Sequence, residues 1–127
     1  MQKKQVVITM LLVGTAVFTQ GCVVAAVGAG AGTVAYVRGD LQTVESKSLD
    51  DVYKAAEKAA KELGLNVTKK TKDAMSATIV ARDAQDKKIT IKLSATAEET
   101  TKLSIRIGVF GSETKSRRIY EEIKKNL

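Results

Sequence analysis

The sequence predicts an α+β domain in which one antiparallel sheet is covered on one face by two helices. Three observations lead to this prediction. Apolar and polar residues alternate in several segments between residues 75 and 109, two other segments repeat apolar residues every three or four positions, and short polar loops separate them. The expected order of elements is β-α-β-β-β-β-α. At 127 residues the chain is expected to form one domain, and a two-layer α/β sandwich over residues 37–127 gives both helices an apolar face to cover.

The first strand is expected at residues 37–45, where Val37, Leu41 and Thr43 share one side. A helix follows, with Ser48 as its N-cap and Asp51 at the third helical position. Its apolar positions are Leu49, Val52, Tyr53, Ala56, Ala60 and Leu63. Gly64 is a natural end to this helix, because glycine adopts the left-handed backbone conformation at little cost.

Four strands and a second helix are expected after Gly64. The first of these strands covers residues 65–71, with Leu65 and Val67 on one face. The inward residues of the next three are Met75, Ala77, Ile79 and Ala81, then Ile89, Ile91, Leu93 and Ala95, then Leu103, Ile105, Ile107 and Val109. This pattern indicates an antiparallel meander with one buried face. The second helix is marked by Ile119, Tyr120, Ile123 and Leu127.

Residues 1–21 are predicted to be a signal peptide. Two lysines precede the apolar or nearly apolar stretch Val6–Phe18, and Gly21 is the small residue before the single cysteine, Cys22. The thirteen residues of this stretch are fewer than the ~20 that a membrane-spanning helix needs. The arrangement resembles a bacterial lipoprotein signal. This resemblance implies cleavage between Gly21 and Cys22 and acylation of Cys22, with membrane lipid as the partner of the acyl chains.

An uncleaved single membrane span is the alternative, because no charged residue occurs between Lys4 and Arg38. Both interpretations keep the basic N-terminus in the cytoplasm and place the domain across the membrane. After cleavage, Val23 would be the second residue. Since Asp is the usual inner-membrane retention residue at that position, the resemblance favours the periplasmic face of the outer membrane over the inner membrane.

Residues 22–36 are predicted to be an uncharged tether rich in glycine and alanine. Gly28, Gly30 and Gly32 alternate with alanine, which is consistent with a flexible tether or a helix lying on the membrane. The alternative is a self-associating structural membrane element, because Gly28 and Gly32 have the GxxxG spacing of packed membrane helices. A phosphate-binding loop is disfavoured because the full GxGxxG motif is absent.

Several of these features occur together in one known family. Cys22, the Val/Ala/Gly segment, the sequence TVAYVRG at residues 33–39 and the Ser-Leu-Asp start of the first helix resemble a family of small Gram-negative lipoproteins. The domain of that family has no known function. The resemblance extends from Cys22 to the C-terminus and implies no catalytic residues.

The composition argues against an enzyme. The chain has no histidine, so it lacks the commonest general base and the imidazole metal ligand. Its single cysteine excludes an internal disulfide and a thiolate-rich zinc site. Its carboxylate pairs fall at a helix start, in turns or on a polar helix face, where acidic residues are common without any function. We therefore expect no catalytic residue, metal site or cofactor.

The formal net charge is +7, and part of the basic excess is expected on the outward face of the sheet. The candidate residues are Lys70, Arg82, Lys92 and Arg106, interspersed with Thr78, Thr90 and Ser104. Such a face attracts anionic polymers or lipid headgroups. The plainer interpretation is a solvated face on which charge prevents aggregation.

The sequence therefore predicts a lipid-anchored periplasmic binding or scaffold module of the cell envelope. An anionic envelope component and an envelope protein bound at the sheet edge are its candidate partners. Nucleic acid is not an expected partner, because an exported domain is separated from it and the aromatic residues that would stack on bases are missing.

Overall fold

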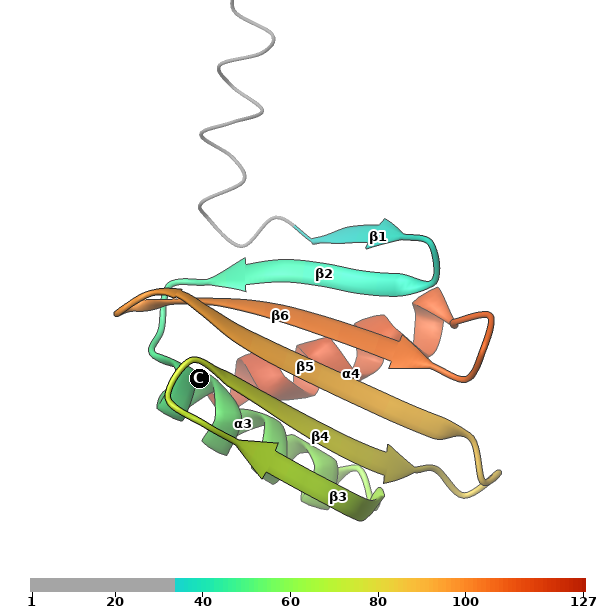
Figure 1. Cartoon of the computed structure of the whole chain (residues 1–127). Coiled ribbons are helices and arrows are strands. Elements are labelled where there is room, and N and C mark those ends of the chain that lie inside the picture. Colours follow the sequence, from blue (N-terminus) through green and yellow to red (C-terminus); the bar gives the residue numbers. More distant parts are fainter. Residues whose placement is uncertain (1–33) are drawn as a thin grey trace, which may run out of the picture.

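A computed structural model describes residues 34–127 as a six-stranded sheet with two helices (Figure 1). The strands are β1 (Ala35–Val37), β2 (Asp40–Glu45), β3 (Asn66–Lys72), β4 (Ser76–Arg82), β5 (Lys88–Ala97) and β6 (Thr100–Ile107). The helices are α3 (Leu49–Glu62) and α4 (Glu113–Lys125). Neighbouring strands are antiparallel, and their order across the sheet is β1-β2-β6-β5-β4-β3. The predicted α+β class and element order are confirmed, with the first predicted strand divided into β1 and β2.

The division of the first strand comes from a two-residue turn. Arg38 and Gly39 have φ values of 53° and 88°, a left-handed pair that reverses the chain between two antiparallel strands. Ala35 and Tyr36, which the sequence analysis assigned to the tether, belong to β1 and pair with Gln42 and Leu41. Tyr36 also packs against the hydrophobic core. The folded domain therefore includes residues before position 37.

The first predicted helix is confirmed together with its capping residues. The backbone amide of Asp51 donates to the Ser48 hydroxyl at 3.2 Å, as expected of an N-cap. The helix ends before Gly64, whose φ of +68° is the left-handed conformation predicted for the stop. Both helices pack on the same face of the sheet (Figure 1).

The buried face of the sheet follows the predicted alternation, with three corrections at strand ends. Val37, expected on the side of Leu41 and Thr43, is paired with Asp40 on the opposite face. The expected residues Ala77, Ile79, Ala81, Ile89, Ile91, Leu93, Leu103, Ile105 and Ile107 are all buried. Met75 and Val109 were expected among them, but they are 63% and 78% exposed. Met75 lies just before β4, and Val109 follows Gly108, whose φ of +65° turns the chain out of the sheet.

One buried polar cluster joins β2 to α4. The Tyr120 hydroxyl donates to a Glu45 carboxylate oxygen at 2.7 Å, and the Thr43 hydroxyl donates to the same oxygen at 3.4 Å. Burial, together with the bond to the Glu45 carboxylate, raises the pKa of Tyr120 to about 12. The phenol therefore remains protonated and able to donate at neutral pH.

The β1–β2 turn packs tightly against the loop between β6 and α4. A Cβ atom on Gly111 would lie 2.6 Å from the Gly39 Cα and 2.6 Å from the Tyr36 hydroxyl oxygen. A Cβ on Gly39 would lie 2.9 Å from the Phe110 carbonyl oxygen. These approaches leave no room for a side chain at either glycine, so the two turns form one packed unit.

We predict that Gly111→Ala destabilises the protein by about 3 kcal/mol or more, because it adds a steric clash to the cost of a left-handed alanine. Gly108→Ala is the matched control, since it has a similar φ in the same loop but no atom within 4 Å of the new Cβ. The control should cost only about 1–2 kcal/mol. Urea denaturation of the three proteins measures the difference. Equal losses in the two variants would contradict the packing argument.

Candidate functional site

The face of the sheet opposite the helices is covered by no helix or strand in the described part of the chain (Figure 1). Strand register defines its residues, because directly paired residues in an antiparallel sheet point to the same side. Lys92 in β5 is paired with Thr78 in β4 and Ser104 in β6, which places it near the middle of this face. Lys102 in β6 is paired with Ser94 in β5 and points to the same side.

Four lysines on this face have no carboxylate partner among residues 34–127. They are Lys69, Lys88, Lys92 and Lys102, and we call the surface that they share the basic face. Lys92 and Lys102 are diagonal neighbours on adjacent strands, so their side chains start about 7–8 Å apart. Within the described strands, Asp40 is the one carboxylate on this side, and it is paired with Arg106.

Hydroxyl groups surround the lysines. They belong to Thr71, Ser76, Thr78, Thr90, Ser94 and Ser104. Hydroxyls both donate and accept hydrogen bonds, whereas the ammonium groups only donate. The basic face can therefore bind a ligand that combines negative charge with many neutral hydrogen-bonding groups.

Lys70 was predicted on this face, and that prediction is wrong. Lys70 is paired with the buried Ile79, so its side chain points to the helix side, where its ammonium lies 2.9 Å from the Glu57 carboxylate of α3. The cause is a β-bulge between Val67 and Lys69, which adds one residue to β3 and inverts the alternation that follows. At the bulge the Thr68 hydroxyl donates to the carbonyl oxygen of Val80.

Arg106 lies on the predicted face, but its guanidinium group is engaged within the protein. It donates to the Arg38 carbonyl oxygen at 3.0 Å, the Asp40 carboxylate at 3.2 Å and the Val109 carbonyl oxygen at 2.5 Å. These contacts join β6, the β1–β2 turn and the loop after β6. Arg106 therefore holds these three segments together and has a structural role.

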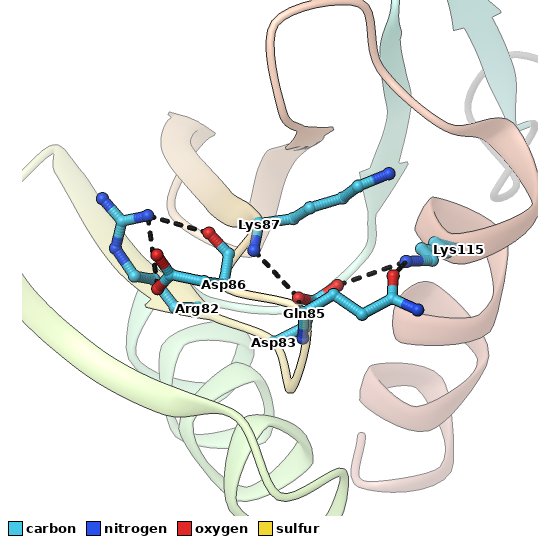
Figure 2. Close-up of polar contacts among 6 residues, drawn as sticks. All are labelled: Arg82, Asp83, Gln85, Asp86, Lys87 and Lys115. Atoms are coloured by element: carbon cyan, nitrogen blue, oxygen red, sulfur yellow. Dashed lines mark hydrogen bonds and ion pairs between the residues drawn. The ribbon is translucent and has the colours of Figure 1, made fainter.

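Arg82 also lies on the predicted face and is held by the neighbouring loop, as Figure 2 shows. Its guanidinium donates to the Asp86 carbonyl oxygen at 2.9 Å and lies 3.6 Å from the Asp86 carboxylate. The same loop is fastened to α4, because the Lys115 ammonium donates to Asp83 at 3.2 Å and to Gln85 at 3.0 Å. Of the four predicted basic residues, Lys92 is the one that lies on this face without a carboxylate partner in the described residues.

The sequence analysis missed Lys69, Lys88 and Lys102. Lys88 and Lys102 obey the alternation already seen in β5 and β6, so extending each predicted strand by one residue would have found them. The position of Lys69 could not be read from alternation, because it depends on the bulge. Among residues 34–127 no three carboxylate or thiol groups lie close enough to hold a metal ion.

The sequence matches one protein-family model, described as a protein of unknown function (DUF3568), over residues 5–126. The chain belongs to the DUF3568 family. No curated protein matches the sequence. The predicted site residues Gly21, Cys22, Gly28, Gly30 and Gly32 of this DUF3568 protein lie outside the described residues. Neither α3 nor α4 is long and apolar enough to cross a membrane.

We predict that Asp83 makes stability depend on acid pH. The backbone amide of Lys87, foremost, and the Lys115 ammonium hold the pKa of Asp83 below its usual 3.8. A lowered pKa stabilises the fold above pH 3.8, and this stabilisation is lost as the pH falls through the lower value in the folded state. Asp83→Asn should therefore reduce stability at neutral pH, and the difference from wild type should shrink in acid.

Denaturation midpoints measured between about pH 6 and about pH 2 test this prediction. Asp86→Asn is the matched control, because Asp86 lies in the same loop with a side chain that is 84% exposed. A difference between wild type and Asp83→Asn that stays constant across this pH range would show that the charge of Asp83 contributes nothing.

Proposed function

We propose that this protein is a lipid-anchored, non-enzymatic binding module of the bacterial envelope, and that its basic face binds an anionic polysaccharide. The observation that carries the binding role is the charge of the open face. Four lysines there lack a carboxylate partner in the described residues, while the single carboxylate on the same side is already paired. The envelope location and the anchor rest on the sequence, through the signal-like segment that ends at Gly21-Cys22.

The arrangement of side chains favours a polymer over a bilayer as the ligand of this face. Lysines separated by several ångströms match charges distributed along a chain, and the hydroxyls between them suit a ligand rich in hydroxyl groups. Insertion into a bilayer requires exposed large apolar side chains. The middle of the basic face has only the half-buried Val44 and Val80. Val37 points to the same side at its edge, and the most exposed large apolar residues, Val109 and Phe110, lie in the loop after β6.

We predict that Lys92→Gln/Lys102→Gln weakens binding of polygalacturonate, an acidic polysaccharide probe, by about tenfold or more, since each lysine at an anionic surface contributes about 1 kcal/mol. The matched control is Lys54→Gln/Lys58→Gln, which removes the same charge from exposed positions on α3. Calorimetry or fluorescence titration of the full chain measures the affinities.

The control variant should bind nearly as tightly as wild type. Equal losses in the two double variants would mean that net charge alone attracts the polymer, and the basic face would then not be a site. If Lys92→Gln/Lys102→Gln instead weakened binding to vesicles of phosphatidylglycerol and left binding of the polymer unchanged, the ligand of this face would be the membrane.

We predict that the mature protein begins at a Cys22 that carries a diacylglyceryl group, and that Cys22→Ser prevents both processing and lipid attachment. Mass spectrometry of the N-terminal peptide from membranes measures this directly. An intact Met1 in the wild-type protein would contradict cleavage and support a single membrane span.

A further inference from the structure

Three large apolar side chains are exposed together at one corner of the domain. Val37, Val109 and Phe110 are 47%, 78% and 93% exposed, and we call them the apolar corner. Val37 directly precedes the β1–β2 turn, and the other two belong to the loop after β6. The close approach of Gly39 to the Phe110 carbonyl group brings these two segments together. Exposed large apolar side chains on two neighbouring segments are typical of a contact surface.

The backbone beneath the apolar corner is held in place. Arg106 donates to the carbonyl oxygens of Arg38 and Val109, so one guanidinium group fastens both turns. The packing of Gly111 against Gly39 and Tyr36 closes the other side of the loop. Because the loop is fixed at both sides, the exposure of Phe110 belongs to the folded structure.

Basic residues surround this corner. Arg38 lies in the same turn as Gly39, Lys88 accepts a backbone hydrogen bond from Gly108 at the base of the loop, and Lys87 precedes Lys88. These three have no carboxylate partner within residues 34–127. The carboxylates of the neighbouring loops and helix start are each paired with a cation: Asp40, Asp83, Asp86 and Glu113.

The opposite end of the sheet carries a hollow lined with carboxylates. A hollow of about 780 Å³ lies there, between the start of α3 and the turns after β3 and β5. Four carboxylates line it: Asp50, Asp73, Glu98 and Glu99. Its single basic residue, Lys72, is paired with Asp50, so three carboxylates in the hollow have no cation partner among residues 34–127. The apolar corner therefore lies at one end of the strands and this hollow, which we call the acidic end, at the other.

We propose that the apolar corner inserts into the headgroup region of an anionic phospholipid membrane. Phe110 and Val109 would enter the boundary between headgroups and acyl chains, while Arg38, Lys87 and Lys88 meet lipid phosphates. The acidic end is repelled by the same surface and points away from it. The proposed anchor would hold this small apolar patch beside a bilayer, which favours lipid over a second protein as its ligand.

The proposal rests on the proposed lipid anchor, which would hold the corner near a membrane. Residues 23–33 separate Cys22 from the described part of the chain, and eleven residues reach at most roughly 40 Å. This tether would join β1, whose last residue is Val37 of the apolar corner. The anchor and the corner can therefore contact the same membrane. Lys88, at the edge of the basic face, would meet that membrane, and Lys92 and Lys102 would remain exposed beside it.

A single tryptophan at the corner tests the proposal, because the chain contains none. Phe110→Trp is compared with Met75→Trp, which places the probe at an exposed apolar position next to the acidic hollow. Each full-length protein is mixed with vesicles of phosphatidylglycerol and brominated phosphatidylcholine. Emission from Phe110→Trp should shift to shorter wavelength and be quenched about twofold more than emission from Met75→Trp. The contrast should shrink in vesicles without phosphatidylglycerol.

If both variants sediment with the vesicles and yet keep the emission of a tryptophan in water, that result would contradict insertion of the apolar corner and leave the proposed lipid anchor intact. Quenching of Phe110→Trp in a protein that mass spectrometry shows to be unlipidated would support insertion of the apolar corner and contradict the proposed acylation of Cys22. A concentration-dependent blue shift of Phe110→Trp without vesicles would mean that a second copy covers this corner, which overturns the membrane contact.

Discussion

Both helices pack on one face of the sheet, and this one-sided burial determines the chemistry of the rest of the domain. The inward residues of β4, β5 and β6 are aliphatic, apart from Thr101 and residues at the end of β5, because α3 and α4 exclude water from them. In the described structure no helix covers the outward residues, so they must be compatible with water. Serine, threonine and lysine meet this requirement. The excess of lysine over carboxylate on that face is not required by solubility alone, since acidic residues solubilise a sheet equally well.

The two kinds of basic residue on the open face have different roles. Arginine presents several donors in a planar fork, which suits it to bridging carbonyl and carboxylate oxygens. Arg106 and Arg82 do this, each holding a loop beside the sheet. Lysine has a compact charge on a flexible stem and makes no such bridges at positions 69, 88, 92 and 102 in residues 34–127. The arginines therefore hold the loops, and the lysines are the residues to which we assign ligand binding in our proposal.

Local sequence patterns predicted the elements well, because those patterns report local physics. Ser48 caps α3 and Gly64 ends it through contacts and backbone conformations within a few residues. The alternation in β4 to β6 follows from the pleat of a strand with one buried face. Where the predictions were wrong, the cause lay in irregular backbone. The bulge after Val67 moved Lys70 to the helix side, and the turn at Gly108 exposed Val109.

The site was predicted less completely than the fold for the same physical reason. Alternation places a lysine on a face, but it does not show whether an aspartate from another strand neutralises it. The pairing of Arg106 with Asp40 depends on β2 lying beside β6, a contact between segments far apart in the sequence. The apolar corner likewise needs the β1–β2 turn to meet the loop after β6.

Arg106 also links the two surfaces that we assign to different ligands. Its side chain leaves the sheet on the basic face, while its guanidinium donates to Val109 of the apolar corner and to the carbonyl of Arg38. A force on the corner loop is therefore transmitted directly to the strand pair β2 and β6. Since β6 also carries Lys102, the corner and the basic face belong to one rigid unit. A domain held at its corner by a membrane would present the lysines at a fixed angle to that membrane, which is a suitable arrangement for binding a polymer that runs alongside it.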